Sequence, residues 1–139
     1  MTTLVLDTSV AVAWYLPEDF RRSARSWQQK LLDGGVRLVV PSFHYWEFAN
    51  VLRTYVRRGE LEAELAQETW DVHLAAPLEV AEPERSQVLA VALEYEATAY
   101  DSVYIALSLM LDCRLLTAER TTKPWVVRLG DRVESVRAT

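Results

Sequence analysis

The stretch TLVLDTSVAVAWYL, residues 3–16, places a carboxylate directly after a short apolar run. Continuous apolar runs with branched side chains, such as residues 3–6, are typical of strands buried on both faces. Asp7 follows the run, and Thr8 and Ser9 come next, before a second apolar segment begins. In open parallel sheets, ligands bind beyond the carboxyl ends of the strands. The position of Asp7 therefore favours a functional carboxylate, although aspartate at such a place also begins turns and helices.

Strand patterns alternate with helical patterns along the whole chain. The sequence predicts strands at 3–6, 36–40, 78–80, 114–116 and 132–136. It predicts helices at about 9–15, 18–32, 42–57, 60–75, 83–96 and 99–112. Such alternation is typical of a parallel sheet that is covered by helices on both faces. Since we find no repeat, low-complexity tract or linker, we expect one α/β domain over residues 1–139.

The composition excludes several classes of protein. Half of the 139 residues are hydrophobic and a quarter are charged, as in ordinary globular domains. No apolar run approaches the roughly 20 residues that cross a bilayer, and no basic segment opens the chain, so we expect neither a membrane span nor a secretory signal. A single cysteine, Cys113, fits a reducing cytoplasm. With only His44 and His73 beside it, the sequence argues against a structural zinc site.

Three further acids stand near predicted strand ends or helix starts. Glu47 lies in the first turns of the helix after the second strand, and Glu119 closes LLTAE just beyond another strand. Asp101 opens the helix in ATAYDSVYIALSLML. Each acid has an ordinary alternative. Asp101 with Thr98 imitates a capping box. Glu47 lies on a polar edge of its helix that faces either solvent or a cleft, and Glu119 alone is typical of a surface acid.

Four carboxylates at one sheet edge would repel one another unless a cation neutralised them. Oxygen ligands without a cysteine or a histidine pair select hard ions such as Mg²⁺ or Mn²⁺. One or two such ions can assist water in hydrolysing a phosphodiester, by clamping the attacking and leaving oxygens. The set of acids thus predicts a site for one or two Mg²⁺ or Mn²⁺ ions and hydrolysis of a phosphodiester.

The formal charge of −5 argues at first against a nucleic-acid partner. Without the four candidate acids, the 20 acidic residues fall to 16 against 15 basic residues, which leaves a net charge of −1. Arginines cluster on two predicted helices, where they are candidate contacts for a nucleic-acid backbone: Arg21, Arg22 and Arg25 on one, and Arg53, Arg57 and Arg58 on the other. Ordinary solvated helix faces explain any single arginine equally well.

Four segments together resemble the motif regions of a known family. In order and spacing, LVLDTSVAVAWYL, PSFHYWEFANVL, TAYDSVYIALSLML and LLTAE are similar to the motifs of PIN-domain ribonucleases. Within that family, the short chain most resembles the VapC-type toxins of type II toxin–antitoxin pairs. The resemblance extends from residue 4 to about residue 136, and its specificity rests on the four segments together. It implies a three-layer α/β/α sandwich with a parallel sheet of four to five strands, and Mg²⁺- or Mn²⁺-dependent cleavage of RNA.

The resemblance also implies which acids bind the metal. Asp7, Glu47 and Asp101 match the first three acids of the family and would be catalytic metal ligands. Glu119 stands where the family usually has aspartate. Because glutamate is one methylene longer and more flexible, a second metal at Glu119 would sit differently or bind more weakly.

Four polar residues match supporting positions of the family. Asn50 follows Glu47 by one helical turn and would orient its side chain. Thr8 or Ser9 would support Asp7 or bind a water on the metal, and Thr117 matches the hydroxyl of the last motif.

Two competing functions follow from the same residues. A haloacid-dehalogenase-like phosphatase also places an aspartate after its first strand, but it needs a second acid two residues later, where this chain has Ser9. The stronger rival is a non-catalytic PIN module that binds protein or RNA with an impaired metal site. Glu119 favours that module, whereas the intact Asp7, Glu47 and Asp101 favour catalysis.

The partners are expected from the family and from the aromatic residues. The resemblance implies an RNA substrate, a homodimer and an inhibitory antitoxin of the VapB type in the cytoplasm. The aromatic residues are numerous, and most are expected to lie in the core. Trp46 lies off the apolar stripe of its helix, and Trp14 and Tyr15 are adjacent, so some aromatics are expected to lie at an interface.

Overall fold

A computed structural model describes residues 1–138 of the chain. Its centre is a five-stranded sheet in the order β3-β2-β1-β4-β5, and every neighbouring pair is parallel. The strands are β1 (Thr2–Leu6), β2 (Val36–Val40), β3 (Glu79–Val80), β4 (Arg114–Thr117) and β5 (Val133–Ser135). The first strand of the chain is thus the central one. The predicted parallel sheet of four to five strands is confirmed.

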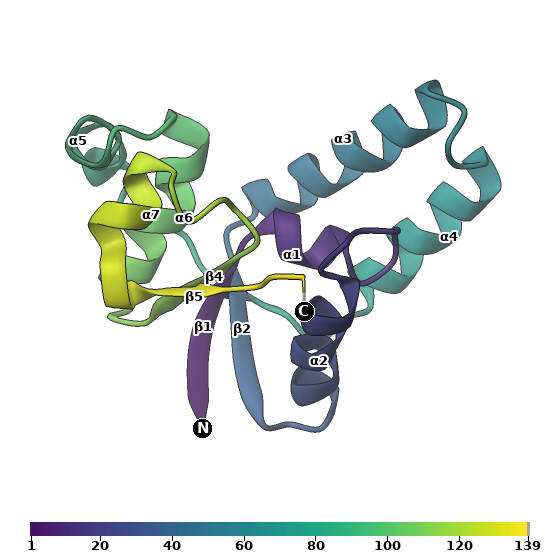
Figure 1. Cartoon of the computed structure of the whole chain (residues 1–139), viewed down its shortest axis with the longest axis horizontal. Helices are drawn as coiled ribbons and strands as arrows, with labels where there is room; N and C mark the ends of the chain where they lie inside the picture. Colours follow the sequence, from purple (N-terminus) through teal and green to yellow (C-terminus); the bar gives the residue numbers. More distant parts are fainter. Residues whose placement is uncertain (139) are drawn as a thin grey trace.

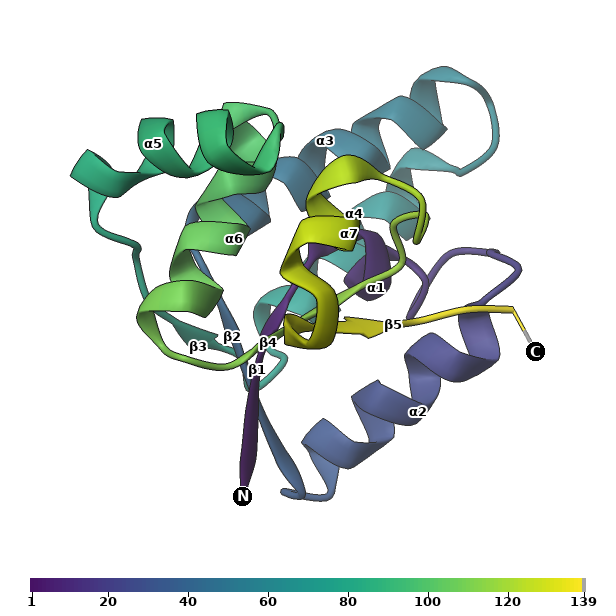
Figure 2. The ribbon, with the colours of Figure 1, turned by 60° about the vertical axis from the view of Figure 1, so that its left-hand side comes forward.

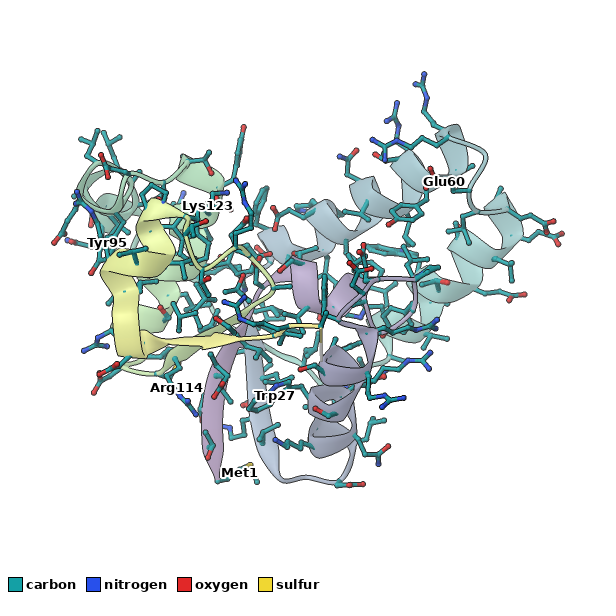
Figure 3. The ribbon with its side chains drawn as sticks, in the orientation of Figure 1. Met1, Trp27, Glu60, Tyr95, Arg114 and Lys123 are labelled. Atoms are coloured by element: carbon teal, nitrogen blue, oxygen red, sulfur yellow. The ribbon has the colours of Figure 1, made fainter. Side chains whose placement is uncertain are left out.

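Seven α-helices surround this sheet in the described residues. They are α1 (Thr8–Val12), α2 (Arg21–Leu32), α3 (Phe43–Arg57), α4 (Ala63–Leu74), α5 (Arg85–Tyr95), α6 (Ala99–Met110) and α7 (Pro124–Leu129). Figure 1 and Figure 2 show α1 to α4 on one side of the sheet and α5 to α7 on the other. The helices α3 and α4 form a hairpin, and Glu60 lies at its far tip (Figure 3). None of the described helices is both long enough and apolar enough to span a membrane.

Alternation along the strands produces two hydrophobic cores. Successive side chains of a strand point to opposite faces, so Leu4 and Leu6 enter one core and Val5 enters the other. The first core lies under α1 to α4 and contains Phe48. The second lies under α5 to α7 and contains Tyr104. The two cores explain why the strands are apolar on consecutive positions, and they confirm the three-layer α/β/α sandwich.

One helix was not predicted. The segment 124–129 forms α7, which begins with Pro124 and buries Trp125 and Leu129. Proline suits the first helical position, because the N–H it lacks would have no partner there. The helix is too short to show a clear apolar period. The predicted helix at 9–15 is also shorter in the structure and ends at Val12.

The aromatic residues divide as their spacing predicts. Trp14 is buried, and its Nε1 donates a hydrogen bond of 2.9 Å to the carbonyl oxygen of Ala24. Trp46 is 68% exposed, as its position off the apolar stripe of α3 predicts. Tyr15 is partly buried and contacts the core under α1 to α4.

Candidate active site

The carboxyl ends of β1 and β4 lie side by side and bring Asp7 next to Thr117. The strands pair with Leu6 opposite Leu116, and the backbone N–H of Asp7 donates to the carbonyl oxygen of Leu116 at 3.0 Å. The Thr117 hydroxyl donates to Asp7 Oδ2 at 2.7 Å. The Thr117 oxygen in turn accepts from the backbone N–H of Glu119 at 3.1 Å. A residue 110 positions away in sequence therefore fixes the carboxylate that ends the first strand.

Asp7 receives a second hydrogen bond on the same oxygen. Ser9 Oγ donates to Asp7 Oδ2 at 2.9 Å, and Ser9 Oγ accepts from the backbone N–H of Ala118 at 3.1 Å. Burial raises the pKa of Asp7 above its ordinary value, and the hydrogen bonds from Thr117 and Ser9 only partly offset it. The negative charges of Asp101 and Glu119 raise this pKa further. Asp7 is therefore a carboxylate whose ionised form a nearby cation would stabilise.

The four candidate acids line one cleft of about 570 Å³. Among the supporting residues, Thr8, Ser9 and Asn50 also line it. Its remaining walls come from Val12, Glu18, Phe20, Val51, Tyr55 and Ala118. The polar edge of α3 that carries Glu47 and Asn50 thus borders a cleft rather than bulk solvent. Residues from both ends of the chain meet here because β1 and β4 are neighbours in the sheet.

Glu47 is held by two hydroxyl groups from other helices. Thr8 Oγ1, at the start of α1, donates to Glu47 Oε1 at 3.0 Å. The hydroxyl of Tyr104, on α6, donates to the same oxygen. Burial raises the pKa of Glu47, the hydrogen bonds from Tyr104 and Thr8 lower it, and the charges of Asp7 and Asp101 raise it again. Sequence reasoning did not identify Tyr104, although it lies on the same face of α6 as Asp101, three residues later.

Asp101 lies in the first turn of α6, which Thr98 caps, and it also lines the cleft. Its backbone N–H donates to Thr98 Oγ1 at 3.0 Å, which is the capping contact that the sequence suggests. Its carboxylate lies 3.7 Å from Lys123 Nζ, and Glu119 Oε2 lies 3.2 Å from the same nitrogen. Lys123 thus places a positive charge between two candidate ligands. Figure 3 shows Lys123 in the loop before α7, at the side of the sheet where the strands end.

The donor set of the cleft fits a hard divalent cation. All of its polar side chains offer oxygen atoms, apart from the amide nitrogen of Asn50, and hard cations prefer oxygen. Burial is the main cause of the raised pKa of Asp7 and of Glu47, and the neighbouring carboxylates add a smaller contribution in the same direction. Within residues 1–138, no three histidine, cysteine, aspartate or glutamate side chains stand close enough together to hold an ion as they are. The acids line the walls of the cleft, so an ion bound by several of them would require these side chains to move, and Lys123 would compete with it for Asp101 and Glu119.

His44 and His73 lie in the protein interior, in contact with each other. His44 Nε2 and His73 Nε2 are 2.9 Å apart, and both side chains are fully buried. His44 Nδ1 lies 3.0 Å from Thr8 Oγ1, and His73 Nδ1 lies 2.9 Å from the hydroxyl of Tyr15. The spacing of three residues places His44 and Glu47 on one face of α3, but it does not indicate that His44 meets His73.

The six candidate arginines lie outside the acidic cleft. Among the described residues, no arginine lines it. Arg53 and Arg57 instead line a separate cavity of about 370 Å³ between α3 and α4, beside Leu52 and Trp70. On α2, Arg25 Nε donates to the carbonyl oxygen of Trp14 at 3.1 Å, and Arg22 is exposed. Contact of these arginines with nucleic acid stays a prediction.

Comparison with known proteins gives a consistent match. The model of the PIN domain family matches residues 4–122. Ribonuclease VapC3 of Pyrobaculum aerophilum is 29% identical over 121 residues, which cover 84% of this chain and 89% of that protein.

Two solved structures are similar in fold. PAE2754 from Pyrobaculum aerophilum aligns with a TM-score of 0.72 and 18% identity, over 97% of this chain and 90% of that one. VapBC2 from Rickettsia felis, solved bound to a DNA fragment from its promoter, aligns with a TM-score of 0.67 and 14% identity, over 96% of this chain and 98% of that one. The family model covers most of the chain, and the solved structures share its fold: the chain belongs to the PIN domain family, and within that family it is similar to a VapC ribonuclease.

Proposed function

We propose that this chain is a Mg²⁺- or Mn²⁺-dependent endoribonuclease that acts as the toxin of a toxin–antitoxin pair. The observation that carries the proposal is the cleft beyond β1 and β4, which is lined by Asp7, Glu47, Asp101 and Glu119. The printed name of the similar VapC3 protein, a ribonuclease, supports the reaction class. RNA and its phosphodiester bonds are the proposed substrate.

Each acid has a proposed role that follows from its surroundings. Asp7 would be the central metal ligand, since Thr117 and Ser9 both fix its Oδ2 and leave Oδ1 for other contacts. Asp101 and Glu119 would complete the ligand set. Glu47 would be a ligand held by Thr8 and Tyr104. A bound divalent ion would supply positive charge against the phosphate and lower the pKa of the attacking water.

The proposed partners follow from the relatives rather than from a surface of this chain. VapBC2 of Rickettsia felis was solved as a complex with DNA of its own promoter. We infer that this chain likewise pairs with an inhibitory antitoxin of the VapB type, because an unrestrained ribonuclease would harm the cell that makes it. A homodimer and action in the cytoplasm belong to the same proposal.

The second candidate function is a PIN module that binds RNA or protein without cleaving it. The contact between Lys123 and Glu119 favours this alternative, because a lysine ammonium group occupies space where a second ion would bind. RNA binding is compatible with both candidates, so cleavage is the property that separates them.

Cleavage of total cellular RNA by the purified protein tests the proposal. Reactions contain Mg²⁺, Mn²⁺ or a chelator, and they compare the wild type with folded Asp7→Asn and Asp101→Asn variants. Asp131→Asn is the matched control, since it removes one negative charge from an exposed residue outside the cleft. We expect discrete fragments that require the metal and disappear in both cleft variants but not in the control.

Two other results are informative. Cleavage that survives both cleft variants would contradict the acidic site and indicate a contaminating nuclease. Metal binding and RNA binding without cleavage would favour the binding module.

A further inference from the structure

A chain of hydrogen bonds leads from Glu47 into the protein interior. Thr8 Oγ1 lies 3.0 Å from both Glu47 Oε1 and His44 Nδ1. His44 Nε2 lies 2.9 Å from His73 Nε2, and His73 Nδ1 lies 2.9 Å from the hydroxyl of Tyr15. These four contacts join residues of α1, α3 and α4 with Tyr15, which lies in the turn after α1. Its inner members, the two histidines and Tyr15, do not line the cleft.

Counting protons fixes the direction of these hydrogen bonds. An ionised Glu47 only accepts, so in its 3.0 Å contact with Glu47 Oε1 the single proton of Thr8 is donated to the carboxylate. Thr8 then has no proton for His44, and His44 Nδ1 must be the donor in their contact.

The same count continues through the two imidazole rings. Burial lowers the pKa of His44 to about 3, with a further contribution from His73, and burial lowers the pKa of His73 to about 4. Both rings are therefore neutral at neutral pH, and each carries one proton. If His44 is protonated on Nδ1, its Nε2 must accept from His73 Nε2. His73 Nδ1 is then bare and accepts from Tyr15, whose pKa burial raises to about 12.

We propose that His44, His73 and Tyr15 are positioning residues for Glu47, through a one-directional chain in which Tyr15 donates to His73, His73 to His44, His44 to Thr8 and Thr8 toward Glu47. The proposal rests on the proposed function, in which Glu47 is a metal ligand. With this polarity, the carboxylate receives donors from both Thr8 and Tyr104. With the opposite polarity, the Thr8 proton would go to His44, and Glu47 would keep Tyr104 alone.

Packing around His73 and Tyr15 holds this chain of hydrogen bonds rigidly. The ring of His73 stacks on Phe48 with a centroid distance of 4.0 Å and an angle of 17° between the planes. The ring of Tyr15 meets that of His73 edge to face at 5.5 Å. A ring held on both sides keeps its nitrogen atoms aimed at fixed partners. Partners of this kind, which contact a metal ligand from behind, typically change metal affinity by about 10- to 100-fold when they are removed.

The protonation pattern of the two histidines tests the direction. They are the only histidines of the chain, so ¹⁵N-histidine labelling and long-range ¹H–¹⁵N spectra report on these two rings alone. We expect His44 to carry its proton on Nδ1 and His73 on Nε2. A Glu47→Gln variant should change the spectrum of His44, because an amide can donate as well as accept. The opposite protonation pattern, or a His44 spectrum unchanged in Glu47→Gln, would overturn the proposal.

Binding of Mn²⁺, measured by calorimetry, tests whether the chain of hydrogen bonds positions Glu47. His73→Phe keeps an aromatic ring against Phe48 but removes the donor, and we expect affinity to fall by roughly tenfold. His73→Gln places an amide N–H near the position of Nε2 and should restore affinity to within about threefold of the wild type. Ser108→Ala is the control, because it removes a buried hydroxyl that is not part of this chain of hydrogen bonds. The Ser108 hydroxyl donates to the Ile105 carbonyl oxygen at 2.8 Å.

The outcomes separate this proposal from the proposed function. A folded His73→Phe variant with wild-type affinity would overturn the positioning role, and so would an equal loss in Ser108→Ala. If the wild type binds no Mn²⁺, the proposed function fails and the positioning role fails with it. The histidine spectra would still show whether the hydrogen bonds run toward Glu47.

Discussion

Lys123 Nζ lies 3.2 Å from Glu119 Oε2, and the two side chains are 33% and 29% exposed. The same nitrogen lies 3.7 Å from Asp101 Oδ2. Glutamate rather than aspartate at position 119 gives the carboxylate one more methylene with which to reach the lysine. The departure from the usual acid of the family is thus matched by a cation four residues later. Together they place a built-in positive charge beside the candidate metal ligands.

Replacing Lys123 with methionine is expected to tighten binding of Mn²⁺. The ammonium group would compete with the ion for two carboxylates, and a unit charge about 4 Å away contributes about 1 kcal/mol in water and about 4 kcal/mol near a protein surface. Because the lysine is partly exposed, we expect a gain of only about three- to tenfold in affinity, measured by calorimetry. Arg120→Gln is the control. It removes a neighbouring positive charge, but Arg120 contacts Glu119 through its backbone N–H, which the variant keeps, so the affinity should change much less. Unchanged or weaker binding in Lys123→Met would show that the lysine does not compete with the ion.

Replacing Thr117 with valine should slow RNA cleavage by about tenfold or more, because Asp7 loses one of the two donors that fix its Oδ2. Valine has nearly the shape of threonine, so the strand should keep its packing. Thr117→Ser keeps the hydroxyl and should remain within about threefold of the wild type. Initial rates at saturating Mg²⁺, with each variant checked for folding by circular dichroism, give the comparison. Equal rates in the valine and serine variants would contradict a role for this hydrogen bond.

The sequence pattern predicts those residues of the site that follow the ends of strands. Asp7 directly follows an apolar run, and Glu119 closely follows another, so the parallel sheet itself brings them to one edge. Glu47 and Asp101 lie on helices, and strand patterns alone do not place them. The resemblance to a family identified them, and the fold then brought them to the same cleft.

The parts that sequence reasoning missed depend on contacts between distant segments. His44 and His73 are 29 positions apart, and nothing in either local pattern shows that their rings meet. Lys123 precedes a helix too short to show an apolar period, so α7 and its lysine had no pattern to reveal them. Clustering of the six arginines along the sequence did not indicate where they lie relative to the cleft, and none of them lines it.

Acidification should destabilise the fold through the buried histidines. Their folded pKa values, about 3 for His44 and about 4 for His73, lie below the ordinary value of 6.5. As the pH falls below 6.5, the unfolded chain binds protons that the folded rings do not bind, so stability is lost from about pH 6.5 down to about pH 4 for His73 and about pH 3 for His44. At pH 5, each histidine should cost about 2 kcal/mol relative to pH 7.

The raised pKa values of Asp7 and Glu47 act in the opposite direction, because their folded forms bind protons more readily. Because the wild type and the His73→Phe variant both contain Asp7 and Glu47, the difference between their losses of stability excludes the contribution of these acids. Urea unfolding at pH 7 and pH 5 should show that the wild type loses about 2 kcal/mol more than the variant. Equal losses in the two proteins would mean that His73 is not held neutral in the fold.

Substituting Arg22 should weaken RNA binding more than substituting Arg57. Phe20, a wall of the acidic cleft, is two residues from the exposed Arg22, whereas Arg57 lines the separate cavity between α3 and α4. Each phosphate contact that is lost should reduce the slope of log affinity against log salt by about one unit. RNA binding by Arg22→Gln and Arg57→Gln, measured across a salt series in the catalytically silent Asp7→Asn background, should therefore show the smaller slope only for Arg22→Gln. A reduced slope for Arg57→Gln alone would place the RNA on the α3–α4 side instead, and equal slopes in all proteins would remove both arginines from the substrate path.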